Sequence, residues 1–364
     1  MEYVQERIAT LHDFDGRGPP VGTQRIDSAA VVVPITHREF ASLAAERVFS
    51  TLESLAPARV IVPVRAPADR IEAIDAWLST FDLERTTLWC NAPGVETLLD
   101  DLGLENGFGK GRDVWLALGP AATAGETVVV HDADAENYDT DLVSRLLAPL
   151  SMGYSFSKGY YARVENDRLY GRLFRLFYAP LLRALTDRHR ADVLAYLDAF
   201  RYALAGEFAM TASLARQLRA PRSWGLEVGT LGDAFDHAGF AGSAQVDLGR
   251  HEHDHRAVAG DTGLEGMSRA VAATLFHVLE DHGIHPEYDL LRGAYAERAD
   301  ELVSQYRADA TFNGLDYDPE RERGQVRRYA DAIAEPGPDR RLPSWSTVAL
   351  EPAEVVDAGR PEAP

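Results

Sequence analysis

The sequence predicts an α/β protein whose first half is a parallel sheet covered by helices. Two observations favour this class. Short runs rich in β-branched residues alternate with segments of helical periodicity, which is typical of consecutive strand–helix units. The chain of 364 residues, 46% of them hydrophobic, is also long enough for one large α/β unit with additions. Strands are expected at 30–35, 58–64, 86–90 and 126–131, and helices at 37–55, 67–81, 93–102 and from about 110.

The second half of the chain is predicted to be mainly helical. Leucines with helical spacing predict a helix at 142–150, and further helices are expected through about 218, at 225–239, 262–283 and 288–308. A β-like run at 154–161 and a strand at 243–249 interrupt them. We therefore divide the chain into an N-terminal extension (1–28), a Rossmann-like nucleotide-binding region (29–150), a second region of the same domain (151–287), a helical arm (288–334) and a tail (335–364). The tail is rich in Pro, Glu, Asp and Ala with little periodicity, which predicts disorder.

The charge of the chain is strongly negative. The net charge is −20, from 37 Lys and Arg against 57 Asp and Glu. A negative surface repels phosphates, so we expect no nucleic-acid partner. The charge fits a hydrated surface adapted to a salty cytoplasm, in which screening weakens self-repulsion. Lysine is rare, because every basic residue other than Lys110 and Lys158 is arginine.

Composition also bounds the compartment. No apolar run approaches the ~20 residues that span a bilayer, and no segment combines a basic start with an apolar stretch. The single cysteine, Cys90, allows no intrachain disulfide and no cysteine-based metal cluster. We expect a soluble, cytoplasmic protein without a membrane span. Whether it forms a homodimer is left open.

Two carboxylates, Asp132 and Asp134, follow the apolar run 126–130 directly. Open α/β sheets bind ligands at the carboxyl ends of their strands, and a divalent cation that bridges diphosphate oxygens needs hard carboxylate ligands there. The pair therefore suggests a glycosyltransferase that uses a nucleotide sugar and Mg²⁺ or Mn²⁺. The alternative is a solvated surface turn, in which Asp is common.

Three further polar positions have two interpretations each. Lys110, between Gly109 and Gly111, stands at a predicted helix start, where it could meet a phosphate or base edge or simply form a turn. Glu39 could bind a ligand or form a capping box with Thr36. Glu227, in an otherwise apolar stretch at the head of a helix, could cap that helix through its dipole or line a site.

Three alternating histidines, His251, His253 and His255, follow the strand expected at 243–249. In extended chain they would face one side, and imidazole beside carboxylate is a common metal environment. A metallo-β-lactamase-type site is one alternative, although the spacing is one residue short of that motif. A polar surface turn without a ligand is the other.

Several segments, taken in chain order, resemble motifs of the glucosyl-3-phosphoglycerate synthases. These are retaining GT-A glycosyltransferases, related to mannosyl-3-phosphoglycerate synthases. The segments are GRLFRLFYAPLL at 171–182 (family GRVTELVARPLL), GEFA at 206–209 (GEYA), GLEVG at 225–229 (GVEIG), AQVDLG at 244–249 (AQVNLG) and MSRAVAATL at 267–275 (MSRQVIATL). Residues 109–111, 132–134 and 157–161 match in the same order. The resemblance implies a GT-A fold with a helical acceptor region at 151–287 and C-terminal helices.

The resemblance also implies roles for individual residues. They are Asp132 near the ribose; Asp134 and His253 on the metal; Lys110 and Glu39 near the uridine end, with Pro34 also binding the nucleotide; Arg172 on the acceptor phosphate; and Glu227 near the sugar and acceptor hydroxyls. Two positions depart from the family, because the threonine of GRVTE is Phe174 here and the later arginine is Ala179. Phenylalanine cannot donate a hydrogen bond to phosphate or carboxylate.

The implied reaction is retaining transfer of a hexose from a nucleotide sugar, with UDP-glucose the expected donor, to 3-phosphoglycerate. Mg²⁺ or Mn²⁺ would neutralise charge on the departing diphosphate. Front-face attack by the acceptor hydroxyl is the preferred mechanism, because no strong protein nucleophile is evident. The alternatives are a related transferase that uses GDP-mannose or a different hydroxyl acceptor, and a sugar-nucleotide-binding protein without turnover.

Overall fold

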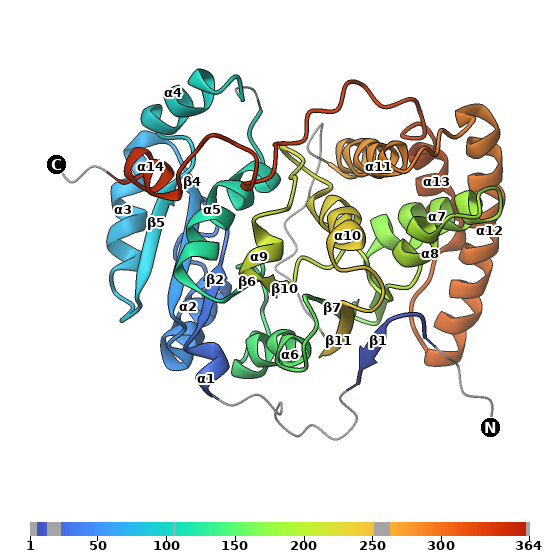
Figure 1. Cartoon of the computed structure of the whole chain (residues 1–364). Helices are drawn as coiled ribbons and strands as arrows, with labels where there is room; N and C mark the ends of the chain where they lie inside the picture. The colour runs from blue at the N-terminus through green and yellow to red at the C-terminus, as the bar shows by residue number, and fades with distance from the viewer. Residues whose placement is uncertain (1–5, 13–22, 105–106, 251–262, 362–364) are drawn as a thin grey trace.

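A computed structural model describes residues 6–12, 23–104, 107–250 and 263–361 (Figure 1). A nine-stranded sheet crosses the molecule in the order β1-β11-β7-β10-β6-β2-β4-β3, with β5 paired to β4. The strands are β1 (Ala9–Leu11), β2 (Ala29–Val32), β3 (Ile35–Thr36), β4 (Arg59–Arg65), β5 (Arg85–Trp89), β6 (Thr127–Val130), β7 (Phe156–Ala162), β10 (Phe208–Thr211) and β11 (Ser243–Arg250). A separate hairpin joins β8 (Val164–Glu165) to β9 (Arg168–Leu169).

The predicted parallel half is confirmed. Strand β2 lies parallel to both β4 and β6, and β4 lies parallel to β5. Helices α2 (Leu43–Leu55), α3 (Ala68–Leu78) and α6 (Thr140–Ser151) contribute to the core on one face, and α4 (Pro93–Asp101) and α5 (Lys110–Ala124) to the core on the other. Because side chains alternate along a strand, Val31 enters the first core and Val32 the second.

Two helix predictions need correction. The helix expected at 37–55 begins only at Leu43, because Ser42 is its N-cap and accepts a hydrogen bond from the Ala45 amide. The helices expected through about 218 are interrupted by β10, which pairs antiparallel with β6 and with β7. A four-residue strand is too short to show a period, and its pairing on both sides overrides the helical propensity around it.

Helices surround the part of the sheet that is formed by the second half of the chain. The π-helical turn η1 (Phe174–Tyr178) continues into α7 (Ala179–Thr186), and α8 (Asp192–Leu197), α9 (Ala212–Ala215), α10 (Leu226–His237) and α11 (Leu264–Asp281) follow. The expected arm consists of α12 (Tyr288–Asn313) and α13 (Pro319–Ala330), which lie at the edge of the molecule opposite β5 (Figure 1). No helix of the described residues is long and apolar enough to cross a membrane.

Both ends of the chain contribute more structure than expected. Within the extension 1–28, β1 adds a parallel edge strand to β11, and α1 (Thr23–Ile26) precedes β2. The prediction of a disordered tail at 335–364 is wrong for its described part. This segment, red in Figure 1, crosses from α13 to α5 and ends in α14 (Pro352–Ala358), which packs on α4 and α5.

The tail is anchored by a few apolar side chains in an otherwise polar sequence. The Trp345 ring stacks on Trp115 of α5 with centroids 5.2 Å apart, and each indole N–H donates to the backbone of the opposite segment. Val355 is fully buried. Because composition averages over these anchors, it predicts disorder where a small number of long-range contacts impose order.

Candidate active site

The carboxyl ends of β2 and β6 form the edge at which the site lies. Val32 pairs with Val130, so the residues that follow each strand, Pro34 and Asp132, emerge at the same edge of the sheet. Parallel neighbouring strands bring their following loops together in this way. The position predicted for the two-aspartate segment, at the end of a buried strand, is confirmed.

Lys110, Asp132 and Glu227 come together from three elements. Lys110 is the first residue of α5, Asp132 follows β6, and Glu227 lies in the first turn of α10. The Lys110 ammonium lies 2.6 Å from Asp132 Oδ1 and 3.5 Å from Glu227 Oε1. Burial alone would lower the pKa of Lys110, but the charges of Asp132 and Glu227 raise it, so the lysine stays charged.

The glycines beside Lys110 approach protein backbone. A Cβ on Gly111 would lie 1.9 Å from the Pro221 carbonyl oxygen, and the Gly111 amide donates to the Ser223 carbonyl over 3.1 Å. The glycines thus allow a close approach to the loop before α10. This contact holds the start of α5, with Lys110, against the segment that leads to Glu227.

Gly225 sets the start of α10. Its φ of 99° lies in the left-handed region, and a Cβ there would meet Thr274 Oγ1 at 2.5 Å. Both the conformation and the space require glycine. Glu227 in the first helical turn therefore has the favourable position near the helix dipole and also the contact with Lys110. That Glu227 lines a ligand site stays a prediction.

Asp134 is held in a state that suits a cation. Its Oδ1 atom is buried and accepts no hydrogen bond from any described residue. Burial and the neighbouring charge of Asp132 raise the pKa of Asp134 to about 7. A buried carboxylate oxygen without a partner is costly, and a divalent cation would remove that cost. Asp134 therefore fits the proposed metal.

The second predicted metal ligand, His253, lies outside the described residues, as do His251 and His255. Within the part of the chain that the structure describes, no three His, Cys, Asp or Glu side chains form a group that could hold a metal ion. Asp134 therefore needs a further ligand from elsewhere, and the position of His253 after β11 is consistent with that requirement.

Two residues of the site, Lys158 and Glu207, were not predicted. Both side chains are buried, on β7 and immediately before β10. Burial raises the pKa of Glu207, and the charge of Asp132 raises it further, whereas Lys110 and Lys158 lower it. Both lysines of the chain therefore belong to this one charged cluster. Their rarity in the sequence was the available signal.

Glu39 lies after β3 at the same edge of the sheet. Its carboxylate accepts hydrogen bonds from the Thr36 amide over 2.8 Å and from the Thr36 hydroxyl over 2.5 Å. The bond from the Thr36 amide is one half of the expected capping box, but the Glu39 amide donates to the Thr36 carbonyl over 3.2 Å. These contacts close a turn, because the helix begins later at Leu43. Pro34 is half-buried between β2 and β3.

Arg172 makes its ion pair with the C-terminal arm. Its Nε atom donates to Glu322 of α13 over 2.9 Å, and buried Arg175 donates to the other oxygen of the same carboxylate over 3.1 Å. Arg172 also lines a pocket of about 330 Å³. The pocket is formed by Arg168, Leu169, Arg172, Asp316, Tyr317, Asp318, Arg321 and Glu322.

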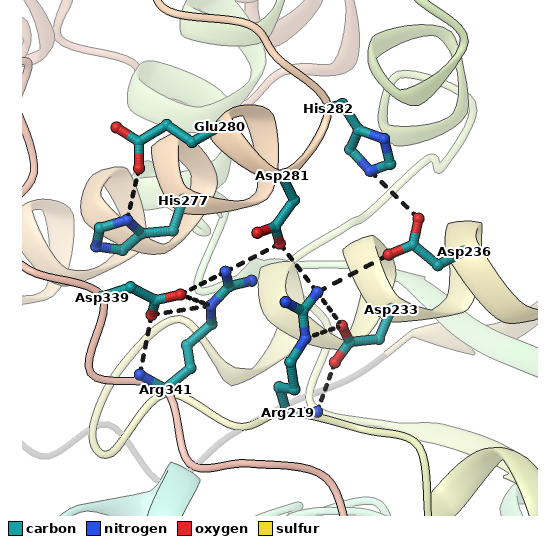
Figure 2. A network of polar contacts seen from close by, with 9 residues as sticks. All are labelled: Arg219, Asp233, Asp236, His277, Glu280, Asp281, His282, Asp339 and Arg341. Atoms are coloured by element: carbon teal, nitrogen blue, oxygen red, sulfur yellow. Dashed lines mark hydrogen bonds and ion pairs between the residues drawn. The ribbon is translucent and has the colours of Figure 1, made fainter. Parts of the chain in front are cut away.

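A network of ion pairs holds α10 in place (Figure 2). Arg219 donates to the buried carboxylate of Asp233 on α10 and lies 2.9 Å from Asp281 on α11. Arg341 of the C-terminal segment reaches the same Asp281 carboxylate over 2.9 Å and also pairs with Asp339. The helix that carries Glu227 is thus tied to α11 and to the segment that was expected to be disordered.

The chain is similar to known proteins over most of its length. No protein-family model matches the chain. A glucosyl-3-phosphoglycerate synthase from Methanococcoides burtonii is 32% identical, with 95% of this chain and 93% of that protein covered. The synthase of the same name from Persephonella marina is 34% identical, with 90% and 87% covered. The chain belongs to the glucosyl-3-phosphoglycerate synthase family.

Solved structures of this family agree with the fold. A glucosyl-3-phosphoglycerate synthase from Mycobacterium tuberculosis, in complex with phosphoglyceric acid, superimposes with a TM-score of 0.58 at 27% identity and covers 77% of this chain and 90% of its own. The same enzyme with Mn²⁺, UDP-glucose and phosphoglyceric acid gives 0.57 at 26% identity, covering 77% and 89%. The predicted GT-A fold and the metal-dependent glycosyltransferase class are confirmed.

Proposed function

We propose that this synthase transfers glucose from UDP-glucose to 3-phosphoglycerate, with the anomeric configuration retained and with Mg²⁺ or Mn²⁺ as cofactor. The observation that carries the proposal is the cluster of Lys110, Asp132 and Glu227 beside Asp134, whose buried Oδ1 accepts no hydrogen bond from any described residue. It lies where GT-A folds bind nucleotide sugars, at the carboxyl end of a parallel strand. The names and bound ligands of the related synthases point to the same reaction.

Asp134, together with His253, would hold the metal. When bound, the cation would neutralise the negative charge that grows on the departing diphosphate. Lys110 would contribute a fixed positive charge at the same edge, since the helix start at α5 also directs its N–H groups there. Asp132 would meet the ribose, with Pro34 and Glu39 nearer the base.

Glu227 would orient the sugar and the acceptor hydroxyl. The contact with Lys110 keeps the carboxylate in one place, so its free oxygen can accept hydrogen bonds from hydroxyl groups. Among the described residues of the site we assign no strong nucleophile to the sugar, which favours front-face attack by the acceptor hydroxyl. Asp134 and Glu227 are thus the residues to which we assign the chemistry.

Arg172 would bind the acceptor. Arg168, Arg172 and Arg321 line one pocket together with the carboxylates of Asp316, Asp318 and Glu322. The three guanidinium groups could bind the phosphate and the carboxylate of the acceptor. The carboxylate of Glu322 accepts from Arg175 on its buried side, so Arg172 can share its charge with a bound anion. Phe174 stacks on Tyr178 and packs on Tyr202, so the position that departs from the family serves packing here.

The charges of the two proposed substrates bear on the compartment in which the reaction takes place. UDP-glucose and 3-phosphoglycerate are multiply charged and do not cross a bilayer unaided. We therefore assign the reaction to the cytoplasm, where both would be formed.

Metal binding should depend on pH below about 7. A folded-state pKa raised to about 7 means that the metal-free protein binds the Asp134 proton more tightly than the unfolded chain does. The stability of the metal-free protein should therefore fall as pH rises from about 4 to about 7. A cation competes with this proton, so its affinity should rise over the same range and then level off.

Thermal midpoints with and without Mn²⁺ at about pH 6 and about pH 8 measure this dependence. The increase caused by Mn²⁺ should be larger at the higher pH. In the metal-free protein, Asp134→Asn should remove part of the loss of stability that occurs as pH rises. Glu207, whose pKa is also raised, should contribute a further part of that loss. An equal Mn²⁺ effect at both pH values would contradict the assignment of Asp134 to the metal.

A screen of donors and acceptors tests the proposed function. The purified protein is incubated with UDP-glucose or GDP-mannose, with Mg²⁺, and with 3-phosphoglycerate, glycerate or an uncharged alcohol, and release of nucleotide is measured. UDP-glucose with 3-phosphoglycerate should give the fastest release. Faster release from GDP-mannose would favour the mannosyl alternative. Binding of UDP without release from any pair would favour the binding protein without turnover.

A further inference from the structure

The segment 205–207 packs on the Lys110–Asp132 ion pair. A Cβ built on Gly206 would lie 2.6 Å from Asp132 Oδ2 and 3.2 Å from the Lys110 ammonium nitrogen. Glycine is therefore needed to keep the Asp132 carboxylate in this position, because the Gly206 backbone forms the wall against which that carboxylate rests. The position of Asp132 depends on where this wall is held.

Strand β7 holds the wall from inside the sheet. The Lys158 ammonium donates to the Ala205 carbonyl, and the Gly159 amide donates to the Glu207 carbonyl over 2.9 Å. These two bonds fix the residues on either side of Gly206. The Lys158 side chain is 1% exposed and lies 5.2 Å from the centre of the Phe208 ring, so it cannot itself reach a substrate.

Burying a lysine here is costly. Burial lowers the pKa of Lys158 to about 8, although the charges of Glu227 and Glu207 oppose that shift. An apolar side chain of similar size often stabilises a buried position more than an ammonium group does. In a chain that otherwise uses arginine, a compact ammonium on a flexible stem suits the single carbonyl that it meets.

We propose that Lys158 is a positioning residue of the donor site, which holds Gly206 against Asp132 and so fixes the carboxylate for the nucleotide sugar. This inference rests on the proposed function, in which Asp132 binds the donor. It assigns Lys158 an effect that passes through Ala205 and Gly206 to Asp132. It predicts that changes at Lys158 and Gly206 affect donor binding only while Asp132 is present.

A double-mutant cycle tests this dependence. Gly206→Ala and Lys158→Met are each made in the native chain and in an Asp132→Ala chain, and the dissociation constant of UDP with Mn²⁺ is measured by calorimetry. In the native chain each change should weaken UDP binding about tenfold, the effect of losing one well-placed charged contact. In the Asp132→Ala chain each should change it less than about twofold.

Stability provides the second readout. Gly206→Ala should leave the thermal midpoint of the ligand-free protein almost unchanged, because the Asp132 carboxylate is partly exposed and can turn away from the new methyl group. Lys158→Met removes a charge near Glu207, and this change affects stability. All UDP titrations are therefore made at a temperature well below the thermal midpoint of each variant. Gly293→Ala is the matched control, since no atom lies within 4 Å of a Cβ at this helical position. It should preserve UDP affinity.

The outcomes separate the inference from the function on which it rests. Equal losses of UDP affinity with and without Asp132 would overturn the positioning role, because the changes would then act by a different route. Unchanged affinity in the native chain would overturn it as well. If the native protein bound no UDP with Mn²⁺, the proposed function would fail, and the inference with it.

Discussion

Asp134→Ala should lower the rate of metal-dependent transfer by at least about three orders of magnitude, because the cation that stabilises the leaving diphosphate would lose a ligand. The fold should persist. One oxygen of the Asp134 carboxylate is buried and accepts no hydrogen bond from any described residue, so its removal relieves a cost in the metal-free protein. The rate is measured as UDP release over a range of Mg²⁺ or Mn²⁺ concentrations.

Glu136→Ala is the matched control. This carboxylate is exposed in the same loop, two residues further on, and its loss should leave the rate unchanged. His253→Ala should resemble Asp134→Ala, and His255→Ala should matter less, although both histidines lie outside the described residues. Near-normal rates for Asp134→Ala, or damage from Glu136→Ala of the same size, would show that the metal is held elsewhere.

Arg172→Ala should raise the KM for 3-phosphoglycerate steeply and change UDP affinity little. Loss of a partly desolvated arginine–phosphate contact typically costs on the order of 2–5 kcal/mol, which corresponds to at least about 30-fold. The side chain also pairs with Glu322, so its loss can lower stability. The split between KM for the acceptor and Kd for UDP distinguishes acceptor binding from a general loss of structure.

Two variants complete the acceptor test. Arg190→Ala, an exposed arginine outside the pocket, should leave both constants unchanged. Phe174→Thr should improve the acceptor KM only modestly, since a neutral hydroxyl contact contributes ~1 kcal/mol. It should also reduce stability, because the Phe174 ring lies 4.9 Å from the Tyr202 ring and stacks on Tyr178. An unchanged acceptor KM in Arg172→Ala would refute the assignment.

The parallel half of the fold could be predicted because its strands are continuous apolar runs with helical segments between them. Strands such as Thr127–Val130 are buried on both faces, and burial leaves a strong signal in the sequence. Strand Phe208–Thr211 left no such signal. It forms a strand because it pairs with two neighbouring strands that are distant in the chain. The tail was mispredicted for a related reason, since the stacking of Trp345 on Trp115 is a long-range contact.

For similar reasons, some residues of the site could be predicted from the sequence and others could not. Lys110, Asp132, Asp134 and Glu227 could be named because each stands at the start of a helix or the end of a strand, in a segment that resembles a known motif. Lys158 and Glu207 lie within or beside strands, where burial hides a charge from sequence reasoning. The sequence left the segment around Lys110 open between a ligand contact and a turn, and the structure shows that its glycines approach the loop at Pro221.

The product made from UDP-glucose and 3-phosphoglycerate shows whether this protein catalyses the proposed retaining glucosyl transfer. The purified protein is incubated with both substrates and Mg²⁺, and the product is examined by mass spectrometry and by the anomeric proton coupling in its NMR spectrum. The account predicts one hexose added to phosphoglycerate, with the anomeric configuration of the donor retained. An inverted linkage, or no product from 3-phosphoglycerate while an uncharged acceptor is glycosylated, would contradict it.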